Sequence, residues 1–488
     1  MVLLTVAISC LGIANALEGS GDGPVTGDTV AMPWSDYFLQ SFYHMSVIPL
    51  LLLTLVFALA ARPSTREEIS PSFRKFQYAY LSVWIFCVGA DWLQGPYVYA
   101  LYSAYGFERH EIAQLFVAGF GASLAFGCVV GSVADRFGRK MSCLAYCAFY
   151  IVSCMTKHVN DYHVLMFGRI TGGIATSMLF SCFECWLVSE HLSRNKFSKG
   201  LLGYMFGLMF TSMYCVAIIA GLTAQFAADT FAFGPISPGS SIYVGGNCAP
   251  FDLSIMCLVI GSVLILALWQ ENYGENEGDS SSSAVEKFQA ACRLLAVDKN
   301  MIFLCFVVSC FEGSMYAFVF NWTPALDSKT IPPPHGLIFA LFMMSCMIGA
   351  SVATILGDNV KAVSRLMGTF LLAIVAFSIL SYVAGHTPSL QMSFFGFLVF
   401  EFCCGLYFPS VGVLKSEVVP EHIRGTMYNI YRVPLNMVVV GLLLSNISMF
   451  QCFVLCASLL TIAFFCVCGL AMRPKPKNDE ACPLNKAC

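Results

Sequence analysis

Long apolar runs alternate along the chain with short segments that hold most of its charges, glycines and prolines. A run of about 20 apolar residues is long enough for an α-helix to cross the hydrocarbon core of a bilayer. The polar segments between the runs are short, as expected for loops that join successive helices at a membrane surface. The pattern predicts thirteen transmembrane helices, at residues 45–62, 76–101, 111–133, 140–156, 163–188, 201–228, 252–270, 301–324, 336–356, 365–384, 390–414, 427–446 and 450–472.

Composition agrees with a membrane protein and argues against several other classes. Of the 488 residues, 58% are hydrophobic and 11% are charged, whereas soluble proteins carry about 25% charged residues. A soluble core stops growing near ~250–300 residues and could not bury this much apolar surface. The net charge of −3 gives no attraction to polyanions. We therefore do not expect a soluble enzyme, a secreted disulfide scaffold, a disordered protein or a nucleic-acid binder.

The first 44 residues precede the helical pattern. Residues 1–16 form a shorter apolar stretch ending in Ala14-Asn15-Ala16, which suits cleavage by signal peptidase. We interpret it as a signal peptide, with an uncleaved anchor helix as the alternative. Residues 17–44 are expected to form a polar tail outside the membrane, followed by an extra transmembrane helix at 45–62.

The basic residues predict the orientation. If the tail before residue 45 lies outside, 21 of the 26 Lys and Arg residues fall in inside loops, three fall outside and two lie within spans. Short cytoplasmic loops carry such an excess of positive charge. The three outside residues are Arg109, Lys157 and Lys329. We therefore expect a multi-pass protein of the plasma membrane, with its N-terminus outside and its tail at 473–488 in the cytoplasm.

The longest inside connection, residues 271–300, divides the remaining spans into two sets of six. It begins acidic and Ser-rich and then becomes amphipathic, with Val285, Phe288, Cys292 and Leu295 on one helical face. Such a helix suits the membrane interface. The predicted fold is therefore an all-α polytopic membrane protein with two six-helix bundles, at 76–270 and 301–472. Bundles of this kind rock around a site near the middle of the membrane.

The loop after residue 130 matches the major facilitator superfamily signature G-x-x-x-D-R-x-G-R-K at every fixed position. Gly131 would let two helices approach closely, and Gly138 would permit a tight turn. Asp135 could pair with an arginine and cap a neighbouring helix N-terminus. We interpret the loop as a gating latch, with a plain basic loop as the alternative. Its residues are Gly131, Asp135, Arg136, Gly138, Arg139 and Lys140.

Six ionisable residues fall inside the predicted spans. A charge at the centre of a membrane helix costs about 2.5–3.5 kcal/mol on insertion scales, so such residues usually face the bundle interior. Arg432 and Glu184 lie near the inner ends of their helices, where snorkelling or gating suits them better than substrate contact. The six residues are Asp91, Arg169, Glu184, Glu312, Glu401 and Arg432.

Arg169 and Glu401 occupy equivalent places in the two halves, because each precedes a glycine by four residues in the fourth helix of its bundle. Arg169 is the only basic residue deep in a span, so it is the candidate partner for an anionic oxygen. Asp91 and Glu312 are likewise equivalent, each followed by aromatic residues and a proline. The alternative for all four is a structural salt bridge.

The candidate substrate site combines Arg169 with hydrogen-bond donors from Gln94, Tyr97 and Asn321. Three acids could take up a proton or hold Arg169 when no substrate is bound, since a buried carboxyl can load a proton. These acids are Asp91, Glu312 and Glu401. We find no metal-ligand cluster and no nucleophile–base pairing at a plausible spacing, so we expect no catalytic residue, no metal and no cofactor.

The chain resembles the molybdate-anion transporter family along most of residues 45–472. The resemblance rests on stretches in both halves, including Ala90-Asp91-Trp92-Leu93-Gln94-Gly-Pro96-Tyr97, Gly168-Arg169 with Gly172-Gly173, Phe183-Glu184-Cys-Trp186, Trp322-Thr323-Pro324, and Cys404-Gly405-Leu-Tyr407-Phe-Pro409. It implies high-affinity uptake of molybdate that feeds molybdenum-cofactor synthesis. The family also carries an extra leading helix, whereas residues 1–44 and the loop at 229–251 depart from its pattern.

Other functions remain open at this point. A transporter of sulfate or an organic anion would need the same charges, because tetrahedral oxyanions are alike in shape. A non-transporting sensor with this fold is a second alternative, which the short tail at 473–488 disfavours. The expected partners are a small inorganic anion and the lipid bilayer, with no nucleic acid, and we expect a monomer.

Overall fold

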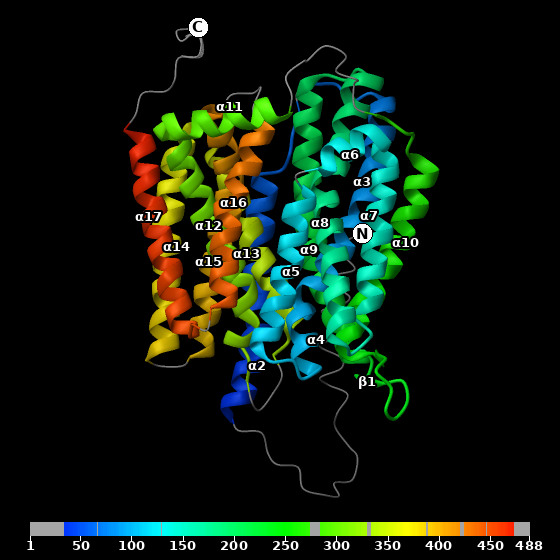
Figure 1. The fold of residues 1–488 in the computed structure, drawn as a ribbon, viewed down its shortest axis with the longest axis vertical. Coiled ribbons are helices and arrows are strands. Elements are labelled where there is room, and N and C mark those ends of the chain that lie inside the picture. Colours follow the sequence, from blue (N-terminus) through cyan, green and yellow to red (C-terminus); the bar gives the residue numbers. More distant parts are fainter. Residues whose placement is uncertain are drawn as a thin grey trace, which may run out of the picture.

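The computed structural model describes residues 34–65, 67–127, 129–273, 284–328, 333–386, 389–419, 424–445 and 447–472. Two groups of long, roughly parallel helices stand side by side, with one helix lying across the end of the second group (Figure 1). This arrangement confirms the predicted all-α polytopic fold. The predicted signal peptide and the tail at 473–488 lie outside the described residues.

The first group, here called the N-terminal half, follows the leading helix α2 (Trp34–Ala60). Its elements are α3 (Pro71–Gln94), η1 (Gly95–Tyr97), α4 (Val98–Ala104), α5 (Arg109–Gly127), α6 (Val130–Phe137), α7 (Arg139–Thr156), α8 (Tyr162–Ser189), η2 (Glu190–Arg194), α9 (Lys199–Thr230), β1 (Gly234–Pro235), β2 (Tyr243–Val244), η3 (Gly246–Cys248) and α10 (Ala249–Leu268).

The second group, the C-terminal half, follows the crossing helix α11 (Ala284–Val297). Its elements are α12 (Lys299–Ala325), α13 (His335–Leu356), η4 (Gly357–Asn359), α14 (Ala362–Gly385), α15 (Leu390–Val418), α16 (Arg424–Leu444) and α17 (Met449–Ala471).

Each predicted span overlaps at least one of these helices, but three of the spans differ clearly, and the first of these, predicted at 76–101, begins at Pro71 and is divided into α3, η1 and α4. Helix α2 begins at Trp34 rather than at residue 45, because apolarity alone does not register the aromatic and polar residues that open it. The predicted span 111–133 is divided between α5 and α6. By length and apolarity alone, nine helices of the described ranges could cross a membrane. Helices α3, α5 and α7 fall below that criterion, and α16 contributes a shorter apolar stretch.

The segment Gly95–Tyr97 interrupts the first helix of the N-terminal half as a single 3-10 turn between α3 and α4. Pro96 has no backbone N–H to donate to the preceding turn, so a regular α-helix cannot continue through it. The turn separates α3 from the seven residues of α4. The first helix of the N-terminal half is therefore divided into two segments, α3 and α4.

The two ends of the molecule differ in what caps them (Figure 1). Helices α6 and α11 lie at one end, here called the signature end. The opposite end carries a short antiparallel hairpin in which Gly234 pairs with Val244, and we call it the hairpin end. Leu294 and Leu295 of α11 pack against the apolar core of the C-terminal half, so the predicted amphipathic helix is present.

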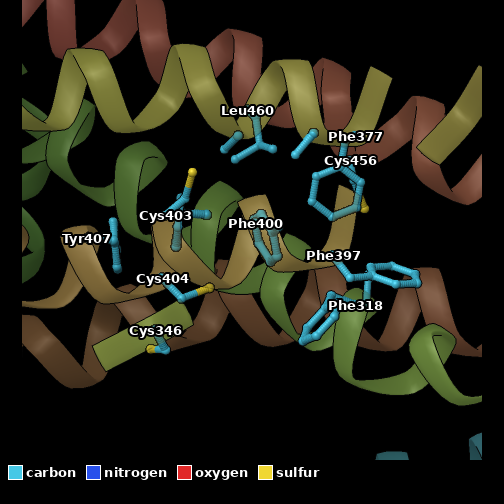
Figure 2. Close-up of a cluster of buried hydrophobic side chains, with 14 of the residues drawn as sticks. Phe318, Cys346, Phe377, Phe397, Phe400, Cys403, Cys404, Tyr407, Cys456 and Leu460 are labelled. Atoms are coloured by element: carbon cyan, nitrogen blue, oxygen red, sulfur yellow. The ribbon is translucent and has the colours of Figure 1, made fainter. Parts of the chain in front are cut away.

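Each half has its own apolar core, and a third cluster joins the halves. The core of the C-terminal half is rich in phenylalanine and cysteine, and Figure 2 shows side chains from several helices meeting around Phe400. Phe377 lies 4.7 Å from Phe400 between ring centroids. The third cluster combines residues near the hairpin end of the N-terminal half with Phe320 and Leu435 of the C-terminal half. The halves therefore share buried apolar surface near the hairpin end.

Candidate functional site

Glycines allow α8 to pack closely between α5 and α7. A Cβ atom at Gly173 would collide with the carbonyl oxygen of Gly119 in α5, and one at Gly172 would lie 2.7 Å from Ser153 Oγ in α7. Small residues permit such close approach between helices in a membrane protein. Helix α8 is therefore fixed against both neighbours at the level of Arg169.

Arg169 lies half-buried between α8 and α5. Its Nε donates to the Leu115 carbonyl oxygen at 3.1 Å, and its guanidinium carbon lies 4.9 Å from the centroid of the Phe116 ring. A Cβ atom at Gly119 would lie 2.6 Å from Arg169 Nη2, so this glycine provides the space for the guanidinium. Within the described ranges, no salt bridge includes Arg169.

A second cation, Lys157, lies in the same region, and the sequence interpretation assigned it to an outside loop. It follows the last residue of α7, yet it is 1% exposed. Its ammonium lies close enough to Arg169 for the two positive charges to repel each other. No spacing in the sequence points to Lys157; it is buried because α7 and α8 approach closely, so that a Cβ atom at Gly168 would collide with Thr156 Oγ1.

The two equivalent acids of the first helices each accept a hydrogen bond from a tyrosine. Asp91 Oδ1 accepts from the Tyr150 hydroxyl. Glu312 Oε1 accepts from the Tyr407 hydroxyl at 3.2 Å and also lies 3.7 Å from Lys415 Nζ. These contacts hold each carboxyl within its own half. The structure does not bring either acid into contact with Arg169.

Glu401 is buried in the C-terminal half beside the Cys346 thiol of α13, which hydrogen-bonds it. Cys346 and Cys404 lie near one another in Figure 2. Arg169 and Glu401 therefore contact different helices, and the pairing of these two residues that the sequence left open does not occur in this conformation. Of the two remaining ionisable residues, Glu184 is exposed, and Arg432 reaches α5, where a Cβ atom at Gly127 would lie 2.8 Å from its Nη1.

The three predicted hydrogen-bond donors have other partners in this conformation. Gln94 Nε2 donates to the Ala90 carbonyl of its own helix at 3.0 Å. Tyr97 Oη donates to Gln225 Oε1 at 3.1 Å. Asn321 Oδ1 accepts from Arg109 Nη2 at 2.7 Å. The structure thus does not gather these side chains around Arg169, and their role in substrate binding stays a prediction.

Hydrogen bonds and aromatic contacts join the two halves at the hairpin end. The Arg109–Asn321 hydrogen bond links α5 to α12. The backbone N–H of Gly336 in α13 donates to Gln225 Oε1 of α9 at 2.9 Å. The rings of Phe116 and Phe320 lie 5.5 Å apart between centroids. These contacts hold the halves together on the hairpin side of Arg169.

A cavity of about 300 Å³ lies beyond these contacts, at the hairpin end between the halves. Arg109, Phe320 and Asn321 line it together with residues of α16 and α17. The Arg109–Asn321 hydrogen bond therefore lies at the boundary between this cavity and the interior.

The signature loop is held by contacts within the N-terminal half. Asp135 Oδ1 lies 2.7 Å from Arg139 Nη2, an ion pair that joins the end of α6 to the start of α7. The sequence suggested that Asp135 would also cap a helix, but Glu271 occupies the N-terminus of α7, accepting from the backbone N–H of Lys140 at 2.7 Å and of Met141 at 3.1 Å.

The glycines and the exposed arginine of the loop differ in their surroundings. Gly138 has φ +103°, a conformation that favours glycine, and a Cβ atom there would lie 2.6 Å from the Glu271 carboxyl carbon. No atom of the described residues lies within 4 Å of the Cβ position of Gly131, so close packing against them does not require this glycine here. Arg136 is exposed, with its guanidinium carbon 5.6 Å from the Phe137 ring centroid.

The structure offers no metal centre among the residues that it describes, since no three His, Cys, Asp or Glu side chains there are grouped to hold an ion. Arg169 offers a cation to a ligand instead. A guanidinium presents several N–H donors in a plane that matches the oxygens of an oxyanion.

Comparison with other proteins places these features in context. A family profile described as sugar transporters with 12 transmembrane segments matches residues 38–406. A "Molybdate-anion transporter" of Xenopus laevis is 34% identical over 446 residues, covering 87% of this chain and 93% of that protein. A "Molybdate-anion transporter" of Danio rerio is 33% identical over 424 residues, covering 81% and 85% respectively.

Solved transporter structures share the arrangement of helices. The crystal structure of the nucleoside transporter NupG matches with a TM-score of 0.60 and 13% identity, covering 82% of this chain and 99% of that one. The crystal structure of a D-xylose–proton symporter matches with a TM-score of 0.63 and 12% identity, covering 83% and 99%. At these identities the likeness concerns the fold alone.

Proposed function

This chain belongs to the molybdate-anion transporter family of the major facilitator superfamily, and on that premise we propose that it takes up molybdate by alternating access. It is a secondary transporter of that superfamily rather than an enzyme. The substrate proposal rests on the identity to molybdate-anion transporters along most of the chain and on a cationic site that an oxyanion would complete.

The observation that carries the proposal is the environment of Arg169. Its guanidinium is half-buried between α5 and α8, with one N–H on a backbone carbonyl and no carboxylate partner among the described residues. A buried cation without an opposite charge is costly. A bound oxyanion would supply that charge and accept two parallel hydrogen bonds from the guanidinium.

Alternating access gives the other predicted residues separate tasks. At the hairpin end, the Arg109–Asn321 contact would have to part for an anion to enter from that side. Protonation of Asp91, Glu312 or Glu401 would compensate the charge of the anion. The signature-loop residues Gly131, Asp135, Arg136, Gly138, Arg139 and Lys140 would form the latch at the opposite end.

The proposed orientation places the signature end in the cytoplasm and the hairpin end outside, at the plasma membrane. It is supported by the basic residues Arg136, Lys140 and Arg194 at the signature end and by the positive-inside rule. The protein is proposed to act as a monomer. Glycan mapping at Asn446, whose sequon is expected on the outer side, checks the orientation.

Uptake measurements test the function. In cells that lack their own carrier, the wild-type chain is expected to accumulate molybdate supplied at nanomolar concentration in the presence of excess sulfate. Arg169→Lys keeps the charge but loses the planar pair of donors. Hydrogen bonds to charged groups are worth about 1.5–3 kcal/mol, so uptake by this variant should fall roughly tenfold to a hundredfold.

Arg74→Lys is the matched control, because Arg74 is exposed on α3. Both variants are compared at equal surface expression. Wild-type uptake that sulfate abolishes, or that does not occur, would reject molybdate as the substrate. Normal uptake by Arg169→Lys would remove Arg169 from the site.

A further inference from the structure

The Lys157 ammonium is buried without a hydrogen-bond partner. The residue is 1% exposed, and its Nζ makes no hydrogen bond to any described group. It lies 5.5 Å from the centroid of the Tyr102 ring. The Tyr102 hydroxyl is also buried, and no described group satisfies it with hydrogen-bond geometry. Buried polar groups are normally paired, so these two neighbouring residues, each with a buried polar group that no described group satisfies, are candidates to bind a ligand.

The close approach of α7 to α8 brings Lys157 towards Arg169. Gly168 has no side chain, and a Cβ atom there would collide with Thr156 Oγ1. Ser153 Oγ of α7 donates to the Gly168 carbonyl oxygen at 2.6 Å, which fixes the crossing. Lys157 directly follows Thr156, and Arg169 directly follows Gly168, so both cations lie next to this crossing. The Tyr102 hydroxyl lies beside the Arg169 guanidinium, so Tyr102 is next to both.

Among the described residues, the groups around Lys157 supply no neutralising charge. Tyr105 Oη donates to the Lys157 carbonyl oxygen at 2.6 Å, and the Cys248 thiol lies 3.9 Å from the same oxygen. Both therefore contact the backbone and not the ammonium. Cys154, one turn earlier on α7, is a buried free cysteine. Asp252 of α10 lies 2.9 Å from His158 Nε2 and is paired there.

Lys157 and Arg169 are neighbouring cations with no described acid paired to either, so each disfavours the positive charge of the other. Burial, and secondly the Arg169 guanidinium, lower the pKa of the Lys157 ammonium to about 7. A bound anion would raise the pKa of Lys157 again, because its negative charge stabilises the protonated amine in place of the lost solvent.

We propose that Lys157, Tyr102 and Arg169 together form one oxyanion-binding site, in which a divalent tetrahedral anion binds with the uptake of one proton on Lys157. This proposal rests on the function proposed above and adds the residues that complete the site. The neutral amine takes a proton from water at the side from which the anion enters. The resulting ammonium and the guanidinium then balance the two negative charges of the anion, and no electron is transferred.

Access to this site depends on the contact between the halves. Arg169 lies on the Phe116 ring, and Phe116 lies against Phe320 of α12. Phe120 and Tyr316 make a second contact of this kind, with ring centroids 4.6 Å apart. Separation of α5 from α12 would therefore expose the Phe116 face of the site.

The test uses the full-length purified transporter and measures its affinity for molybdate and for sulfate at pH 6 and pH 8. With a free pKa near 7, the affinity of the wild type should fall about tenfold between these pH values, because the proton must be supplied at binding. Lys157→Met should bind at least tenfold more weakly at pH 6 and lose the pH dependence. Lys157→Arg should bind tightly at both pH values.

Folding is checked by the melting temperature without anion. Lys157→Met should melt no lower than the wild type, since it replaces a buried polar group that has no described partner with an apolar one. Lys75→Met is the matched control, because Lys75 is exposed on α3, and it should keep the wild-type affinity and pH profile.

The outcomes separate this proposal from the substrate proposal. Molybdate binding that is equal in Lys157→Met and wild type overturns the site and leaves the transporter's substrate intact. Binding of sulfate alone, lost in Lys157→Met, keeps the site and rejects molybdate. If neither anion binds the wild type at either pH, both proposals fail.

Discussion

Arg169 and Glu401 occupy the same position in the two halves, with opposite charge. Each lies four residues before a glycine, and that glycine packs on the backbone of the second helix of its half. A Cβ atom at Gly173 would collide with the Gly119 carbonyl oxygen, and one at Gly405 with the Cys346 carbonyl oxygen. The helix crossing is thus repeated in both halves.

The residue that faces the charge differs between the halves. Gly119 faces the guanidinium and has no side chain, so a large planar cation fits beside α5. Cys346 faces the carboxyl and fills the equivalent space with a thiol that hydrogen-bonds it. One backbone arrangement therefore accompanies both charges, and the residue on the neighbouring helix differs in size between the two halves.

The largest effect is expected from breaking the shared crossing. Gly173→Ala and Gly405→Ala each place a methyl group against a backbone carbonyl that cannot move aside. Overpacking costs typically 1–3 kcal/mol, and we expect about 3 kcal/mol here. Both variants should show lower melting temperatures, less folded protein and little uptake, to a similar extent in the two halves.

Gly121→Ala in α5 and Gly412→Ala in α15 are the controls, since no described atom lies within 4 Å of either Cβ position. Both should melt as the wild type does. A Gly173→Ala variant that folds normally while Gly405→Ala does not would mean that the crossing is not equivalent in the two halves.

A smaller and more selective effect is expected from the residue that faces each charge. In Gly119→Ala, the new methyl group would lie 2.6 Å from Arg169 Nη2, at the movable end of a side chain. The guanidinium would shift, so the affinity for the anion should fall about tenfold with little change in melting temperature. Binding and melting measurements on the purified protein separate the two quantities.

Cys346→Ala should do the opposite. It leaves a small void and removes the hydrogen bond to Glu401, at a cost of about 1–2 kcal/mol of stability. Anion affinity should stay at the wild-type value. An equal loss of affinity in Gly119→Ala and Cys346→Ala would contradict the assignment of the anion site to the N-terminal half.

The smallest effect concerns the loops that follow the second helices. In the N-terminal half, the Glu271 carboxylate accepts from the backbone N–H of Lys140 and Met141. In the C-terminal half, the Arg365 guanidinium instead donates to the Gly357 carbonyl oxygen. Glu271→Gln removes a negative charge from the start of α7 and should cost about 1 kcal/mol in chemical denaturation.

Glu68→Gln, at an exposed position, is the control for this variant and should be neutral. A stability loss well above the expected value would show that Glu271 does more than stabilise the helix terminus.

The repeat of charged positions could be predicted from the sequence because it depends on spacing along one helix. Arg169 with Gly173 and Glu401 with Gly405 each fall one turn apart, so the equivalence of the two residues is visible without coordinates. The fold was predictable for the same reason, since apolar runs and loop charges are local signals.

Contacts between helices could not be predicted in this way. Lys157 is outside any apolar run, and only the close approach of α7 to α8 buries it. Gln94, Tyr97 and Asn321 fall at suitable depths along their helices. Their hydrogen-bond partners, however, depend on how each helix is rotated about its axis and on the contacts at the hairpin end. Spacing along a chain does not determine either.

The short helix α4 contacts two functional parts of the molecule at once. It is separated from α3 by the turn at Gly95–Tyr97. Tyr99 on α4 contacts Phe320 of the opposite half, with ring centroids 5.5 Å apart, and Tyr102 on the same helix contacts Lys157. Any displacement of α4 would therefore alter the contact between the halves and the wall of the cationic site together.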